Sequence, residues 1–220
     1  MSAVKRIFDL VWTVPVLIVI SPLFALIAVA IKLDDGGPVF FTQVRVGQGG
    51  KPFTLRKFRT MGVSREGPLV TAAGDARVTI VGRILRETKL DELPELFNVL
   101  TGDMSLVGPR PEVPCYVDLD GKLWQEVLRA RPGITDPVTL RLRNEEALLA
   151  SAEGDRETFY RCTLQPYKLR GYRDYLRKRS LWSDAKVLIQ TLLAVVSPGR
   201  TPPPTLEEIC SVLSEDQKLS

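Results

Sequence analysis

The chain has 220 residues, a formal net charge of +4, three cysteines and no histidine. This length suits one domain of ordinary size, and the lack of histidine excludes Ser-His-Asp triads, histidine metal sites and histidine proton shuttles. Cys115, Cys162 and Cys210 are far apart and odd in number, which argues against a disulfide framework or a zinc site and predicts free thiols in a reducing compartment.

Residues 10–31 form an uncharged, apolar run about as long as a bilayer is thick. A secretory signal peptide fits poorly, because the run is too long and contains two prolines. A straight spanning helix fits the length, and so does a helix that enters the membrane, breaks and leaves on the same side. Lys5 and Arg6 before the run and Lys32 after it favour the last reading, because the positive-inside rule places both ends in the cytoplasm.

The middle of this run contains Ser21 and Pro22. Pro22 removes one helical hydrogen bond and clashes with the preceding turn, whereas Ser21 can bond to the carbonyl that is freed. The pair therefore predicts a break, although spanning helices that contain proline leave the straight alternative open.

A β-hairpin is predicted next, with strands over 39–46 and 53–61 joined by a glycine-rich loop. This loop lacks the spacing of a phosphate-binding P-loop. Leu55, Lys57 and Arg59 share one face of the second strand, because strand side chains alternate. The two cations form either a solvated face or one wall of a phosphate site. Residues 62–76 read as a loop that could close over a ligand, and residues 77–90 read as a helix.

Two adjacent carboxylates, Asp91 and Glu92, follow at the start of a short predicted helix that extends to Leu100. Pro94 fits only in the first turn, which makes Asp91 a candidate N-cap. The alternative is chemical, since a carboxylate kept ionised at a helix N-terminus can act as a nucleophile or bind Mg²⁺.

Basic residues flank this acid pair, and Arg86, Lys89 and Arg110 could gather phosphate oxygens around it. Arg110 lies between Pro109 and Pro111, whose rings fix the backbone and would present the guanidinium at low entropic cost. The alternative for this segment is a proline-rich turn with a solvated arginine.

Further helices are predicted over 118–131 and 184–196. The second is almost entirely apolar and too short to span a membrane, so it is either a core helix or an interfacial helix on lipid. Basic residues at 170–179 favour the membrane surface. The predicted fold is α+β and mainly helical, with a membrane helix over 1–36, a catalytic domain over 37–200 that contains the hairpin and interfacial amphipathic helices, and a tail over 201–220.

Five motifs, in the same order along the chain, resemble those of the bacterial sugar transferase family, the small monotopic phosphoglycosyl transferases. They span roughly residues 3–196. The matching stretches are Lys57-Phe58-Arg59-Thr60-Met61, Leu90-Asp91-Glu92-Leu93-Pro94-Glu95-Leu96, Asn98-Val99-Leu100-Thr101-Gly102-Asp103-Met104-Ser105, Gly108-Pro109-Arg110-Pro111 and Pro132-Gly133-Ile134-Thr135.

The resemblance implies transfer of a phospho-sugar from a UDP-sugar to a polyprenyl phosphate, with release of UMP, at the cytoplasmic face of the inner membrane. It implies that Asp91 is the nucleophile of a ping-pong reaction and that Glu92 assists it through Mg²⁺ or proton handling. It also implies that Arg86 and the Pro-Arg-Pro motif at 109–111 contact the substrate phosphates. Finally, it implies a re-entrant helix that is broken at Ser21 and Pro22. Such a reaction would initiate capsule, O-antigen, exopolysaccharide or glycoprotein glycan assembly.

Residues 136–146 depart from the family pattern. Many members follow Pro-Gly-Ile-Thr with Gly-Trp-Ala-Gln, whereas Asp136-Pro137-Val138-Thr139 stands here. The sugar specificity therefore stays open. The oligomeric state, for which a homodimer is one candidate, and substrate contact by Lys57 and Arg59 also stay open. Two other functions compete with the transferase. One is a catalytically silent membrane adaptor with the same fold. The other is a nucleic-acid-binding protein, for which no zinc spacing, leucine zipper or aromatic-interleaved basic strand is found.

Overall fold

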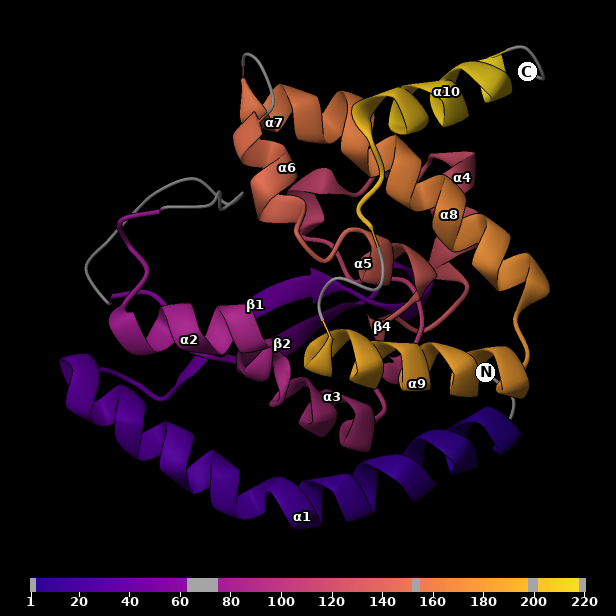
Figure 1. Cartoon of the computed structure of the whole chain (residues 1–220). Coiled ribbons are helices and arrows are strands. Elements are labelled where there is room, and N and C mark those ends of the chain that lie inside the picture. Colours follow the sequence, from indigo (N-terminus) through magenta and orange to yellow (C-terminus); the bar gives the residue numbers. More distant parts are fainter. Residues whose placement is uncertain (1–2, 63–74, 152–154, 198–201, 218–220) are drawn as a thin grey trace.

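The computed structural model describes residues 3–62, 75–151, 155–197 and 202–217. The first element, α1 (Ala3–Asp35), forms an arc along one side of the molecule (Figure 1). It is long and apolar enough to cross a membrane, and only 11% of its most apolar window is buried. Apolar side chains that point outward from α1, such as Ile18 and Val19, are therefore available to a lipid environment.

The predicted helix break at Ser21 and Pro22 is wrong, because α1 continues through both residues. Pro22 has no N–H to donate to the carbonyl of Ile18, four residues earlier. The hydroxyl of Ser21 donates to that oxygen at 2.8 Å. The side chain therefore replaces the lost backbone bond and the helical path is kept, while Figure 1 shows α1 curved.

Both ends of α1 are bonded to the rest of the domain. Near the N-terminus, Lys5 lies 2.7 Å from Asp184 and 3.3 Å from Asp9. At the C-terminus, Asp35 accepts a fork of hydrogen bonds from Arg59. Arg59 thus ties the helix to the end of the hairpin, and its guanidinium is engaged away from the acid pair.

The buried group around Lys5 is called the anchor cluster here. Asp9 accepts from the hydroxyl of Ser105 at 2.9 Å, and Asp184 accepts from the hydroxyl of Tyr175 at 2.7 Å. The cluster comprises Lys5, Asp9, Ser105, Tyr175 and Asp184. Each carboxylate oxygen in it has a partner, so its charges are compensated within the fold.

The predicted hairpin is confirmed. Strands β1 (Phe40–Val46) and β2 (Pro52–Phe58) pair in antiparallel register, with Gln43 opposite Leu55. A second small sheet pairs β3 (Ser105–Val107) with β4 (Gly133–Thr135) in parallel. Gly133 allows this close approach, because a Cβ there would lie 2.1 Å from the backbone nitrogen of Gly108.

Helices make up most of the remainder. The described helices after β2 are α2 (Ile80–Thr88), α3 (Glu95–Thr101), α4 (Lys122–Leu128), α5 (Pro137–Arg141), α6 (Glu145–Ser151), α7 (Arg156–Phe159), α8 (Gln165–Lys178), α9 (Leu181–Val196) and α10 (Leu206–Gln217). A π-helical turn at Tyr160–Leu164 leads into α8. The predicted loop over 62–76 falls mostly on residues 63–74, outside the described part of the chain.

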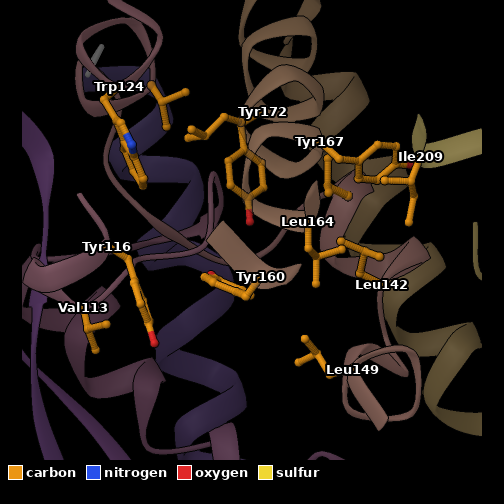
Figure 2. Packing of buried hydrophobic residues seen from close by; sticks show 13 residues of the cluster. Val113, Tyr116, Trp124, Leu142, Leu149, Tyr160, Leu164, Tyr167, Tyr172 and Ile209 are labelled. Atoms are coloured by element: carbon orange, nitrogen blue, oxygen red, sulfur yellow. The ribbon is translucent and has the colours of Figure 1, made fainter. Parts of the chain in front are cut away.

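Three apolar clusters hold these elements together. The largest packs α4, α5, α8 and the π-helical turn, and Ile209 of α10 is completely buried in it. Figure 2 shows Ile209 beside Tyr167 and Leu142. A second cluster joins β2, α3, β3 and α9, and a third packs Ile27 and Ile31 of α1 against Phe58 and Leu85.

Helix α9 has both a buried and an exposed apolar face. Val187 and Ala194 are buried, whereas Trp182 is 70% exposed and Leu192 is 68% exposed. A capping box between Ser180 and Ser183 starts the helix. Helix α9 therefore packs one apolar face into the core, as a core helix would, and leaves a second apolar face exposed. The three cysteines are free and exposed, which confirms the prediction of free thiols.

Candidate active site

Asp91 and Glu92 lie in a tight 3-10 turn, Leu90–Glu92, between α2 and α3. Lys89 makes this turn possible by adopting the left-handed conformation, with φ 60°, at the end of α2. The predicted capping role of Asp91 is wrong. Helix α3 begins only at Glu95, after Pro94, and no side chain caps it. Asp91 is instead turned inward and 9% exposed, and its Oδ1 has no hydrogen-bond partner in the described structure.

Glu92 is held by two cations. Lys57 of β2 donates to Glu92 Oε1 at 2.9 Å. Arg110 makes a forked contact with the same carboxylate, with one arm at 3.3 Å and a shorter one to Oε1. This bidentate geometry fixes both the position and the ionised state of Glu92.

A third carboxylate completes the group. Glu95, on the first turn of α3, is 1% exposed, and its Oε1 lies 3.3 Å from Lys57 Nζ without hydrogen-bond geometry. Lys57, Asp91, Glu92, Glu95 and Arg110 are called the acid cluster here. Sequence motifs identified four of these residues as candidates. Glu95 stood in a quoted motif, but no pattern distinguished it from a surface residue on a short helix.

The three carboxyls have different charge preferences. Burial raises the pKa of Asp91 above its ordinary value, and the positive charge of Lys57 offsets this only in part. Burial would also raise the pKa of Glu92, but Arg110 and Lys57 outweigh it and hold that pKa well below its usual range. Burial raises the pKa of Glu95 to about 7. Neighbouring carboxyls with pKa values driven apart are typical of sites that perform acid, base or nucleophilic chemistry.

The Pro109-Arg110-Pro111 segment is held in place by backbone bonds. The N–H of Gly133 donates to Pro109 O at 2.9 Å, and the guanidinium of Arg45 donates to Pro111 O at 3.0 Å. The segment follows β3 directly. The small parallel sheet therefore positions Arg110 opposite Glu92, a contact that the Pro-Arg-Pro pattern did not specify.

Arg86 lies at the same cavity but contacts other groups. Its Nε donates to the hydroxyl of Thr60 at 2.9 Å, and its Nη1 donates to Glu146 at 3.2 Å. Arg59 is engaged by Asp35, as described above. The structure thus brings Lys57 and Arg110 onto the acid pair, whereas Arg59 and Arg86 line the same cavity and are bound to other groups. Their phosphate contacts remain predictions.

A cavity of about 1660 Å³ runs past these residues. At one end it is lined by apolar side chains of α1 and α9, among them Trp12, Val16 and Leu192. At the other end, toward α6 and α8, it is lined by polar residues of the turn after α5 and of these two helices, namely Arg143, Asn144, Glu145, Lys168 and Tyr172. Asp91, Glu92 and Arg110 also line it. One cavity therefore offers both an apolar and a polar environment to molecules that reach the acid cluster.

The polar end contains a buried network that the sequence did not indicate. Lys168 donates to Glu112 at 2.9 Å and to the hydroxyl of Tyr160 at 3.1 Å, and it lies 3.4 Å from Glu145. Glu112 directly follows the Pro-Arg-Pro segment, which was the one available signal. Lys168 and Tyr172 come from a helix more than 50 residues later, with no motif around them.

The acid cluster has donors that suit Mg²⁺ but few of them are free. Carboxylate oxygens are the ligands that this ion prefers, and the unpartnered Oδ1 of Asp91 is one. Both oxygens of Glu92 are occupied by Arg110 or Lys57. Within the described residues, no group of three or more acidic or cysteine side chains is arranged to hold a metal. The site therefore fits an ion that takes one or two protein ligands and completes its shell with substrate and water.

Comparison with known proteins gives one family, described as bacterial sugar transferase, whose match covers residues 1–198. The chain is 40% identical over 198 residues to a UDP-glucose:undecaprenyl-phosphate glucose-1-phosphate transferase of Caulobacter vibrioides, which covers 88% of this chain and 70% of that protein. It is 39% identical over 194 residues to the Escherichia coli K12 protein described in the same words, which covers 86% of this chain and 39% of that protein.

A third relative differs in the sugar it is named for. The UDP-N-acetylgalactosamine-undecaprenyl-phosphate N-acetylgalactosaminephosphotransferase of Aeromonas hydrophila is 36% identical over 203 residues, covering 88% of this chain and 44% of that protein. The chain thus spans less than half the length of the Escherichia coli and Aeromonas relatives, and similar identity occurs with relatives named for different sugars.

Proposed function

Because this chain belongs to the bacterial sugar transferase family, we propose that it transfers a sugar 1-phosphate from a UDP-sugar to polyprenyl phosphate. The products are polyprenyl diphospho-sugar and UMP, and the reaction initiates assembly of a surface glycoconjugate. The observation that carries this proposal is the acid cluster. A buried carboxylate with a free oxygen lies next to a carboxylate held by a lysine and an arginine, in a cavity with one apolar and one polar end.

The reaction proceeds in two displacements at one phosphorus. Asp91 attacks the phosphorus that carries the sugar, the bond to the bridging oxygen breaks, and UMP leaves with that oxygen. An oxygen of polyprenyl phosphate then attacks the same phosphorus, the acyl phosphate bond breaks, and the Asp91 carboxylate is regenerated. Positioning and positive charge around the phosphoryl oxygens supply most of the catalysis in such reactions.

The surrounding residues prepare Asp91 for this role. Burial raises the pKa of Asp91, so the free site disfavours its ionised form. Lys57 and Arg110 supply nearby positive charge that favours the ionised form and offsets part of this effect. Glu92 keeps these two cations in place and is itself fully engaged, which assigns it to positioning and leaves the attack to Asp91.

Mg²⁺ is the proposed cofactor. When bound, it would offset the charge of the diphosphate. Asp91 Oδ1 is the side-chain atom free to hold it, whereas Glu92 would have to release Arg110 or Lys57 first. Asp91 and Glu92 were both candidate ligands of the ion, and the proposal now assigns the ion to Asp91.

The lipid substrate enters from the apolar end of the cavity. Trp12 and Val16 of α1 and Leu192 of α9 line that end. The exposed apolar face of α9 lies beside it, so we propose that α9 rests on the membrane surface as an interfacial helix. The nucleotide sugar then enters the polar end from water, and the two substrates meet at Asp91.

We also propose that α1 enters and leaves the membrane on one side, at the cytoplasmic face. A straight 33-residue helix would be about 50 Å long. Contacts with the same domain at both Lys5 and Asp35 support a same-side arrangement, because a domain outside the bilayer cannot reach both ends of a spanning helix. Basic residues near both ends favour the cytoplasmic side.

The first test is UMP release by the full chain in detergent, with Mg²⁺, polyprenyl phosphate and a panel that includes UDP-glucose and UDP-N-acetylgalactosamine. Turnover with at least one donor is expected, and Asp91→Asn should abolish it. Arg141→Lys, on an exposed ion pair with Glu208 outside the cavity, is the matched control and should keep full turnover. If no donor gives UMP with or without lipid, the silent adaptor replaces the transferase as the better account.

A further inference from the structure

Tyr172 presents a buried hydroxyl that no protein group satisfies. The residue is 1% exposed, and its Oη has no hydrogen-bond partner in the part of the chain that the structure describes. Figure 2 shows the ring projecting from α8 with the hydroxyl directed away from that helix. Tyr172 lines the polar end of the cavity. Leaving such a group unpaired costs free energy, so an unpaired hydroxyl in a cavity wall indicates a missing partner.

The other residues that line the cavity define the surroundings of this hydroxyl. Arg110 of the acid cluster lines the same cavity, and so do Lys168, Glu112 and Glu145 of the buried network. A molecule bonded to Tyr172 would therefore occupy the cavity that also holds the reacting phosphate of the proposed reaction.

The neighbouring polar groups are already occupied. Lys168 has Glu112, Glu145 and the hydroxyl of Tyr160 as partners. Tyr160 donates to Glu112. By contrast, Arg143 Nη1, which belongs to another lining residue, is buried and also lacks a partner. Two residues with unpaired polar atoms, one on α8 and one in the turn between α5 and α6, thus line the same end of the cavity.

The unpaired atoms at this end are hydrogen-bond donors that a neutral, hydroxyl-bearing ligand can satisfy. The charge of Lys168 is compensated by Glu112 and Glu145, whereas the phenol and the Arg143 guanidinium are free to bond to ligand hydroxyl groups. Burial raises the pKa of Tyr172, so its hydroxyl stays protonated and can donate to a ligand oxygen. The phosphate itself is better served at the acid cluster by Arg110 and Lys57.

We propose that Tyr172 is a substrate-recognition residue whose hydroxyl bonds to an oxygen of a ring attached to the reacting diphosphate. This inference rests on the proposed function and extends it to the choice of donor. Two rings of a UDP-sugar have this chemistry, the hexose and the ribose. The contact would make the rate sensitive to the pattern of hydroxyls on whichever ring occupies the polar end.

Tyr172→Phe removes only the hydroxyl and gives two opposite effects. Catalytic efficiency with the best UDP-sugar of the panel should fall about five- to tenfold, the value of one hydrogen bond. The ligand-free protein should melt higher, by ~2–4 °C, because an unsatisfied buried group has been removed. A merely structural tyrosine would not give this combination.

Tyr175→Phe is the matched control on the same helix. Its hydroxyl donates to Asp184 at 2.7 Å within the anchor cluster, so its loss should lower the melting temperature. Because Tyr175 does not line the cavity, donor preference among the panel should not change.

Two further arms identify the ring. If the ring is the hexose, a donor that lacks the contacted hydroxyl should be used equally by wild type and Tyr172→Phe, and inhibition by UMP should be unchanged. If the ring is the ribose, UMP inhibition should weaken in step with the KM for the donor. Efficiency within about twofold of wild type for every active donor, or a lower melting temperature in Tyr172→Phe, would overturn the proposal. A wild-type protein that releases no UMP would instead contradict the proposed function.

Discussion

The anchor cluster and the acid cluster each bury carboxylates together with cationic side chains. They differ in how many of their carboxylate oxygens have a hydrogen-bond partner. In the anchor cluster, Asp9 and Asp184 use every carboxylate oxygen on Lys5, Ser105, Tyr175 or a backbone N–H. In the acid cluster, Asp91 Oδ1 has no partner, and Glu95 Oε1 has only a nearby lysine without hydrogen-bond geometry.

This difference separates a structural role from a chemical one. Buried polar groups are normally satisfied, so a saturated cluster stabilises one arrangement of α1 against α9 and β3. A cluster with free oxygens is less stable than it could be and keeps atoms available for a ligand or a reacting bond. Changes in the anchor cluster should therefore reduce stability, whereas changes in the acid cluster should reduce activity and can raise stability.

The largest effect is expected from Asp91→Asn. Turnover should fall by at least about a thousandfold, because the amide cannot act as the nucleophile. The melting temperature should stay the same or rise, since a buried carboxyl with an unpaired oxygen has become neutral. UMP release and thermal melting of the same preparation check both. Turnover within about tenfold of wild type would remove Asp91 from the reaction.

Asp9→Ala should give the reverse pattern. It leaves Lys5 with one carboxylate fewer, takes the acceptor from the Leu106 N–H and removes one of the two acceptors of the Ser105 hydroxyl, which should cost about 3–5 kcal/mol of unfolding free energy. Denaturant titration in detergent measures the loss. At a temperature where the variant is folded, turnover per folded molecule should be near that of wild type. An unchanged unfolding free energy would contradict the structural role of this cluster.

Glu95→Gln tests the pH dependence of the acid cluster. Burial raises the pKa of Glu95 to about 7 from an ordinary 4.5, so the folded protein holds a proton that the unfolded chain releases. Stability from the neutral form is complete below about pH 4.5 and is lost as pH rises toward 7, by at most about 3 kcal/mol.

Melting curves of wild type and Glu95→Gln should therefore coincide near pH 4.5 and separate above it, with the variant melting higher at pH 8. Glu126→Gln, on an exposed pair with Arg177, is the control and should follow wild type throughout. A constant difference between wild type and Glu95→Gln at every pH would show that Glu95 does not titrate in this range.

The smallest effect is expected from Arg110→Lys. Lysine keeps the positive charge but cannot form the fork with Glu92, so catalytic efficiency should fall about tenfold. Arg141→Lys breaks a similar fork with Glu208 on the surface and should change efficiency by less than about twofold. Equal effects of the two substitutions would mean that the Arg110 fork has no special role.

Local patterns predicted much of the fold and identified four of the five residues of the acid cluster as candidates. The glycine-rich loop between alternating strands predicted the hairpin, and the paired acids with Pro-Arg-Pro identified Asp91, Glu92 and Arg110. These features are encoded by neighbouring residues. Lys57 was also a candidate, but its contact with Glu92 spans 35 residues of sequence and no pattern indicated it.

The failures have physical causes of the same kind. Capping of α3 was one of two interpretations of Asp91, but a left-handed Lys89 turns this residue into the interior. Ser21 and Pro22 were expected to break α1, but the serine hydroxyl restores the lost bond. Tyr172 and Lys168 were missed because only tertiary packing of α8 brings them to the cavity. In each case, the folded chain supplied a conformation or a contact that the local pattern did not indicate.

The central claim is that Asp91 carries the phospho-sugar between the two substrates. The most direct measurement mixes the detergent-solubilised chain with its UDP-sugar and Mg²⁺ in the absence of polyprenyl phosphate, and follows UMP with time. The account predicts a burst of about one UMP per enzyme, lost in Asp91→Asn, with the mass of a sugar phosphate added to the peptide that contains Asp91. UMP that appears only after polyprenyl phosphate is added would instead indicate direct transfer in a ternary complex, and Asp91 would not be the nucleophile.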